Sequence, residues 1–247
     1  MVRGLWTGSA LIVLALIMAC SAVAQAQSLD VIFQVRDKSG PNSPIAASGR
    51  VHIQEMLSTD KVQSRYDLDI QLTNASPKTI LAYEVSVEGM PDYGAGFQHV
   101  YMTDSFFLPQ LDFLPGVQKS EIFSDPGWQT VPRGGAGPRD MKVSVRVLFV
   151  EFADGSIFGS SHWAAALSAN RQRSIQRMEE IEAAYEASGE TGLRNALAAA
   201  QNRQDDPQDT LAVMSDLKGK LDSGGAEAAA NEMREFMAVA QTRKDIM

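Results

Sequence analysis

Cysteine is nearly absent from the 247-residue sequence, which contains a single one, Cys20. A chain with one cysteine cannot form an intramolecular disulfide, so the fold must depend on a hydrophobic core. Histidine is also scarce, because the sequence contains only His52, His99 and His162. None of them lies within metal-ligand spacing of another histidine or of Cys20, so the sequence predicts no metal site.

The motifs that mark common catalytic sites are missing as well. The sequence has no Gly-x-Ser-x-Gly turn, no phosphate-binding glycine loop and no His-Glu-x-x-His motif. Basic residues are outnumbered, with 22 Lys and Arg against 30 Asp and Glu and a net charge of -8. Nucleic-acid phosphates attract basic surfaces, and this chain is acidic. We therefore expect no catalytic residues, no cofactor and no nucleic-acid partner.

Residues 1–26 have the three parts of a secretory signal peptide. Arg3 supplies a positive charge, an apolar run covers residues 11–19, and small residues end at Ala24-Gln25-Ala26. The apolar run is shorter than the roughly 20 residues that a membrane-spanning helix needs. We expect cleavage after Ala26 and an exported, periplasmic or extracellular protein without a stable membrane span. Because Arg3 is the only charged residue removed, the mature chain would be one unit more negative.

Lipid attachment at Cys20 is the alternative. The segment Ile17-Met18-Ala19-Cys20 resembles the processing site of bacterial lipoproteins, although Ile17 and Met18 differ from the residues preferred there. Processing at this site would leave the protein anchored to a membrane. Cleavage after Ala26 would leave it untethered.

Alternation of apolar and polar residues predicts β-strands across residues 27–160. The clearest alternation covers residues 66–73, where every apolar side chain lies on one face. Turn residues at 74–77 and a second alternation at 81–88 predict a hairpin. Further strands are expected at residues 31–36, 51–54, 100–103, 117–123, 141–152 and 157–158.

Seven to eight short strands with one apolar face each favour an antiparallel β-sandwich, because a second layer must cover that face. The pattern resembles immunoglobulin-like and fibronectin-type-III-like sandwiches over about residues 29–160. The Cys…Trp…Cys pattern of true immunoglobulin domains is absent. The resemblance is architectural, and it implies a binding or scaffolding module by analogy.

Helical periodicity begins after residue 160 and predicts an α-helical module over residues 161–247. Breaks at Ser188-Gly189, Asp206-Pro207 and Gly224-Gly225 divide it into about four helices. We expect Asp206 to be the N-cap of the third helix, with Pro207 at its first position. Many apolar positions are alanine, which buries little area, so the module should depend on the β-module for stability. Trp163 is the expected anchor between the two.

Two features are candidate partner contacts. The loop at residues 105–115 is apolar and contains two prolines, and it either closes one end of the β-module or offers a contact surface. In the first helix arginines precede glutamates, the reverse of what the helix dipole favours. These arginines are solvated, pair with neighbouring helices or bind an acidic partner. The candidate contact residues are Phe106, Phe107, Leu108, Leu111, Phe113, Arg171, Arg173 and Arg177.

Export, a sandwich-like module and the missing catalytic motifs favour a non-enzymatic protein of a bacterial envelope. Its partner would be an unidentified protein or envelope component. Two alternatives stay open. A hydrolase of an envelope polymer would need carboxylates that converge in a pocket. A periplasmic chaperone or assembly factor would need an exposed sheet edge that accepts a strand.

Overall fold

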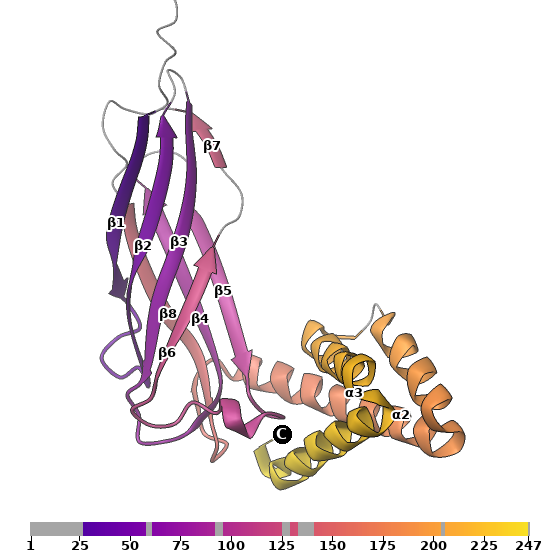
Figure 1. Cartoon of the computed structure of the whole chain (residues 1–247). Helices are drawn as coiled ribbons and strands as arrows, with labels where there is room; N and C mark the ends of the chain where they lie inside the picture. Colours follow the sequence, from indigo (N-terminus) through magenta and orange to yellow (C-terminus); the bar gives the residue numbers. More distant parts are fainter. Residues whose placement is uncertain are drawn as a thin grey trace, which may run out of the picture.

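The computed structural model describes residues 27–57, 61–91, 96–124, 129–132, 141–203 and 206–246. Within these residues the chain forms nine strands followed by two long helices. Figure 1 shows a tall, curled sheet with the helices beside one end. Among the described residues, no helix is both long and apolar enough to cross a membrane. The predicted signal peptide and the Cys20 lipid site lie outside the described residues.

The strands form one mixed sheet. They pair in the order β5-β4-β8-β1-β2-β3-β6, with β7 beside β3 and β9 beside β8. Every pair is antiparallel except β1 with β8, which is parallel. The strands are β1 (Gln27–Asp37), β2 (Ile45–Leu57), β3 (Lys61–Asn74), β4 (Ile80–Pro91), β5 (Phe97–Asp104), β6 (Gln118–Ser124), β7 (Gln129–Pro132), β8 (Met141–Phe152) and β9 (Ile157–Gly159).

The predicted antiparallel, immunoglobulin-like sandwich is therefore wrong. A single mixed sheet curls into a half-barrel, and β1 joins its two walls. The first part of β1 pairs with β2, whereas Val35, Arg36 and Asp37 at its end pair with β8. Alternation reveals which face of a strand is buried, and it contains no information about which strand lies beside it.

The hairpin predicted over residues 66–88 is also wrong. β3 and β4 lie in opposite walls of the curled sheet, and the segment between them crosses from one wall to the other. Asn74 stabilises this crossing, because its amide nitrogen donates hydrogen bonds to the carbonyls of Lys78 and Phe113. Burial also distinguishes the two strands, since residues 81–87 of β4 are buried on both faces.

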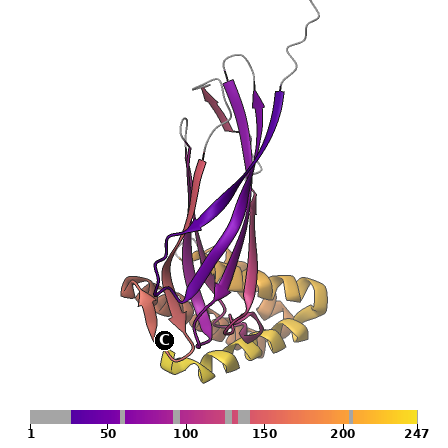
Figure 2. The same ribbon diagram turned by 90° about the vertical axis from the view of Figure 1, so that its left-hand side faces the viewer.

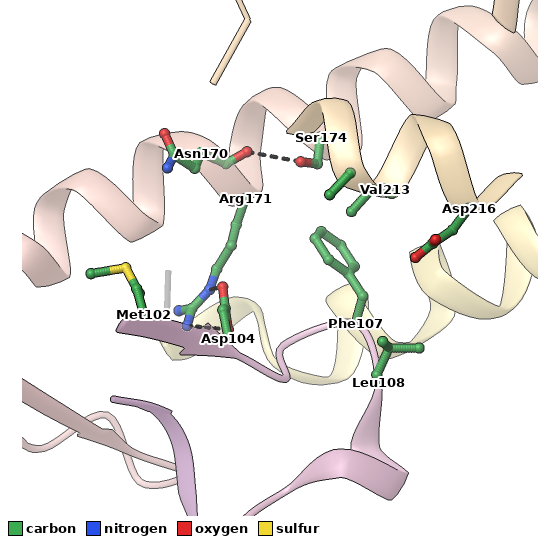
Figure 3. A pocket seen from close by; sticks show the side chains of 10 residues that line it. Met102, Asp104, Phe107, Leu108, Asn170, Arg171, Ser174, Val213 and Asp216 are labelled. Atoms are coloured by element: carbon green, nitrogen blue, oxygen red, sulfur yellow. Dashed lines mark hydrogen bonds and ion pairs between the residues drawn. The ribbon is translucent and has the colours of Figure 1, made fainter. Parts of the chain in front are cut away.

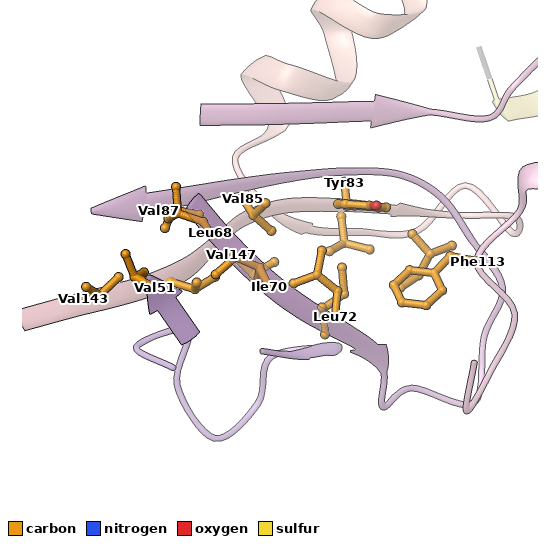
Figure 4. Close-up of a cluster of buried hydrophobic side chains, with 14 of the residues drawn as sticks. Val51, Leu68, Ile70, Leu72, Tyr83, Val85, Val87, Phe113, Val143 and Val147 are labelled. Carbon is orange, nitrogen blue, oxygen red and sulfur yellow. The ribbon is translucent and has the colours of Figure 1, made fainter. Parts of the chain in front are cut away.

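The predicted apolar face of β3 is confirmed. The alternating apolar residues of β3, such as Leu68 and Ile70, are buried and face Val85 and Val87 of β4 inside the curled sheet (Figure 4). Reversal of the chain at Asp154-Gly155 is confirmed too, because β9 pairs antiparallel with β8. Strand β7 was not predicted.

The helical module consists of α2 (Ser161–Gln201) and α3 (Gln208–Thr242), each made of two helical segments, so the predicted division into four segments is confirmed. Each is interrupted once, at Gly189 and Gly225, where the backbone is not helical. Seen from the side, they lie across one end of the sheet (Figure 2). They share a second apolar core, formed by Met178, Ile181, Leu193, Leu197, Ala200, Met214, Leu217, Leu221, Ala229, Met233 and Phe236.

The start of α2 packs on the outer face of the sheet. Leu167 is buried against Ala82 of β4 and Phe149 of β8, and Trp163 packs against the same cluster. The predicted anchoring role of Trp163 is thus confirmed. The contacts of Trp163 and Leu167 with the sheet fix the direction in which α2 leaves it.

Candidate functional site

The loop between β5 and β6 connects the sheet core to the helical core. It contains a short 3-10 helix, η1 (Pro109–Leu111). Phe113 lies in the sheet core, with its ring centre 5.7 Å from that of Tyr83. Phe107 and Leu108 pack against the helical core instead. The apolar residues of this loop therefore serve two separate cores.

Arg171 of α2 attaches the helices to the sheet. Its side chain is 1% exposed, and Nε and Nη2 donate hydrogen bonds of 2.9 and 3.0 Å to the Asp104 carboxylate. Nη2 also donates a 2.5 Å hydrogen bond to Glu151 of β8. The guanidinium carbon lies 4.4 Å from the ring centre of Phe106, within cation–π range. One buried cation thus holds two strands, the loop and α2 together.

Electrostatics at Arg171 favour the charged guanidinium. Burial alone would lower the pKa of Arg171, but the hydrogen bonds and negative charges of Asp104 and Glu151 outweigh burial and raise it. Burial raises the pKa of Glu151 above its usual value, and Arg171 offsets only part of that rise. A shared arginine therefore leaves one carboxylate incompletely compensated.

Arg243 makes the second attachment, at the end of α3. Its Nη1 donates hydrogen bonds to the carbonyls of Ser105 and Phe106, at 3.1 and 3.0 Å. Its Nη2 donates a 2.8 Å hydrogen bond to Asp112. We call Arg171 and Arg243, with their bonded partners, the junction clamps. Both contact the loop between β5 and β6. Arg171 of α2 packs on the Phe106 ring, and Arg243 at the end of α3 donates hydrogen bonds to the loop.

Arg177 stabilises the helical module internally. Its Nε and Nη2 donate hydrogen bonds of 2.8 and 2.9 Å to Asp206, and Nη1 bonds Glu180. The predicted N-cap role of Asp206 is wrong, because α3 begins at Gln208 with Pro207 at the cap and no side-chain cap bond. The hydrogen bond from Arg177 is the main reason that the pKa of Asp206 is lowered.

The eight candidate contact residues fall into three groups. Four are buried and bonded or packed within the protein, namely Phe106, Phe113, Arg171 and Arg177. Two are half-buried at the junction, namely Phe107 and Leu108. Two are exposed, Leu111 at 50% and the Arg173 side chain at 43%. The unusual charge order of α2 reflects buried carboxylates that pair with Arg171 and Arg177.

Sequence reasoning did not single out Glu151 or Arg243. A signal existed for Glu151, because it lies near the end of β8 where neighbouring residues on both faces are apolar. A carboxylate in such a position needs a partner, since burial of an unpaired charge is costly. Arg243 carried no such signal, because it lies in a polar segment at the end of the chain.

A cleft of about 270 Å³ lies beside Arg171, where β5, the loop and both helices meet (Figure 3). Arg171 reaches from α2 to Asp104, and Phe107 points from the loop toward Val213 of α3. The apolar part of the lining consists of Met102, Phe107, Leu108, Ala212 and Val213. The polar part consists of Asp104, Asn170, Arg171, Ser174 and Asp216.

Most polar groups of the cleft are already bonded. Asp104 accepts hydrogen bonds from Arg171, and the Ser174 hydroxyl donates to the Asn170 carbonyl at 3.0 Å. Asp216 is exposed and forms no ion pair with any described residue. The cleft can bind an apolar group, and the Asp216 carboxylate places a negative charge at its rim.

Comparisons with known proteins add little. Neither a protein-family model nor a curated protein sequence matches the chain. Among solved structures, the Salmonella enterica trimeric lipoprotein SadB is similar at 12% sequence identity and a TM-score of 0.23. The match covers 56% of this chain and 67% of that chain. A TM-score this low supports no inference about the chain.

Proposed function

We propose that this is a non-enzymatic exported protein of a bacterial envelope that binds or scaffolds a partner, with sheet and helices acting as one rigid unit. The buried Arg171 clamp is the observation that carries this proposal. Separating the modules would leave Arg171, Asp104 and Glu151 without their partners. Breaking a buried ion pair costs about 3 to 5 kcal/mol.

A fixed orientation of the two modules favours binding. Modules within one chain move relative to each other unless their interface is large and apolar. Here charged clamps restrict that motion at both ends of the helical module. A partner that contacts both modules then meets a preorganised surface and loses less free energy to ordering.

Affinity capture from the organism's own envelope fraction tests the proposal. Full-length tagged protein, cross-linked in cells, should recover the same partner in replicate captures. The Arg243→Gln variant, checked for folding by circular dichroism, should recover less of it because one clamp is lost. Release of soluble fragments from an envelope polymer by the purified protein would contradict the proposal and favour a hydrolase.

A strand-accepting assembly factor is the second candidate, and the sheet edges favour it. β5 and β6 end the strand order, so each has one side without a neighbouring strand among the described residues. Each edge also bears an exposed apolar residue, Val100 at 51% and Ile122 at 73%. Addition of a strand would protect the outer amides of β5 from hydrogen exchange when an unfolded client protein is present.

A further inference from the structure

We propose that the cleft at the junction binds an extended segment of a partner protein in which a large apolar side chain stands next to a lysine or arginine. The inference rests on the proposed binding function and specifies the ligand class of the cleft. Size, lining and charge each support one part of it.

The size of the cleft suits side chains of a polypeptide. Pockets for whole drug-sized ligands measure about 300 to 1,000 Å³, and this one measures about 270 Å³. Met102, Phe107 and Val213 form apolar walls on three different elements. Methionine adapts its shape easily, so such walls can close around side chains of differing outline.

The charge of the cleft selects a cation. Among the residues that line the cleft, Asp104 and Asp216 are negative and Arg171 is positive, and Arg171 is already paired with Asp104. Asp216, at the rim, therefore leaves the lining with a net negative charge. An anionic ligand would be attracted only by Arg171, whose Nε and Nη2 already bond two carboxylates.

Nearby cations do not neutralise Asp216. Lys218 pairs with Asp222, and Arg173 lies 3.7 Å from Asp206. The rim carboxylate is therefore available to a lysine or arginine that follows an apolar residue into the cleft. Leu111 and Leu114 of the same loop are also exposed.

Matched peptides test this inference by NMR titration of the isotope-labelled full chain. The probes are acetyl-Gly-Leu-Lys-Gly-amide, the same peptide with Glu for Lys, and the same peptide with Ala for Leu. We expect the Leu-Lys peptide to shift the amide signals of Met102, Phe107 and Val213. The Glu peptide should bind about two- to fivefold more weakly, as expected for an exposed charge pair. The Ala peptide should bind about tenfold more weakly.

Two variants distinguish the rim charge from general acidity. Asp216→Asn should abolish the preference for Lys over Glu, whereas Glu227→Gln, an exposed site on α3 outside the cleft, should preserve it. Equal binding of the Lys and Glu peptides, or shifts that avoid the cleft, would overturn the inference. If the peptide-induced shifts avoid the cleft while the full chain still captures its partner, the cleft assignment fails and the proposed scaffolding function stands.

Discussion

Arg171 is charged, almost fully buried and shared by two carboxylates, so its removal should be costly. Arg171→Met keeps most of the side-chain volume but leaves Asp104 and Glu151 without a counter-ion. We expect the free energy of unfolding to fall by about 3 to 5 kcal/mol, measured by urea denaturation. The matched change Arg173→Met removes a half-exposed arginine and should cost less than about 1 kcal/mol. Equal effects of the two substitutions would contradict the clamp.

Asp206 should stabilise the folded state at neutral pH. Its pKa is lowered in the fold, chiefly by Arg177, so its contribution is fully present above the ordinary aspartate pKa of about 3.9. That contribution is lost as pH falls toward the folded-state pKa. Asp206→Asn should therefore cost about 1.5 to 3 kcal/mol at pH 7, and the difference from wild type should shrink below pH of about 4. A difference that stays constant from pH 7 to pH 2 would exclude this linkage.

Glu84 should affect stability in the opposite direction, because its ionised form should destabilise the fold at neutral pH. It is buried on β4, burial raises its pKa, and its Oε2 has no hydrogen-bond partner among the described residues. The ionised carboxylate thus destabilises the fold above its folded-state pKa, and protonation removes that cost as pH falls. Glu84→Gln should be as stable as wild type or more stable at pH 7, with the gain disappearing near pH 4. Marked destabilisation at pH 7 would mean that the carboxylate has a stabilising partner.

At the scale of elements, Gly225 decides where α3 bends. Its φ of 82° and ψ of 179° fall in a region that is essentially restricted to glycine. A Cβ there meets no atom within 4 Å, so Gly225→Ala tests backbone strain alone and should cost about 1 to 3 kcal/mol. Gly219→Ala, in a regular and exposed part of the same helix, should instead stabilise by about 0.5 to 1 kcal/mol. Thermal melts followed by circular dichroism compare the two, and a shift of the same sign would refute the assigned bend.

Elements were predictable where the information is local. Alternation in β3 and the glycine breaks at Gly189 and Gly225 depend on residues within a few positions of one another. Strand neighbours depend on residues far apart in the chain, so the crossing from β3 to β4 and the parallel pairing of β1 with β8 could not be inferred. Periodicity is the same for a hairpin and for two strands in opposite walls.

The sequence indicated many of the residues that form the candidate site. It indicated only part of what those residues do in the fold. The apolar loop and the arginines of α2 stood out in the sequence. The loop and Arg171 lie at the junction, whereas Arg177 pairs with Asp206 inside the helical module. Their bonding to one another could not be inferred, because Arg171 and its partner Asp104 are 67 residues apart. Charge order in a helix indicates that a partner exists, and only the fold identifies it.

At the scale of the whole molecule, the helical module should be weakened when it is separated from the sheet. Residues 161–247 have their own apolar core, but Leu167 and Arg171 would lose their partners on the sheet. We expect this fragment to be only partly helical and residues 27–160 to fold alone, as measured by circular dichroism with thermal melts. A fully helical, cooperative melt of residues 161–247 at the temperature of the full chain would contradict the dependence.

Rigidity of the junction is tested most directly by a distance measurement between the two modules. Spin labels at Ser48→Cys on β2 and Glu235→Cys on α3 occupy exposed sites, and Cys20→Ser removes the only native cysteine. Double electron–electron resonance should give one narrow distance peak for this protein and a broader distribution when Arg171→Met is added. A broad or multiple distribution with both junction clamps intact would contradict the proposal that sheet and helices act as one rigid unit.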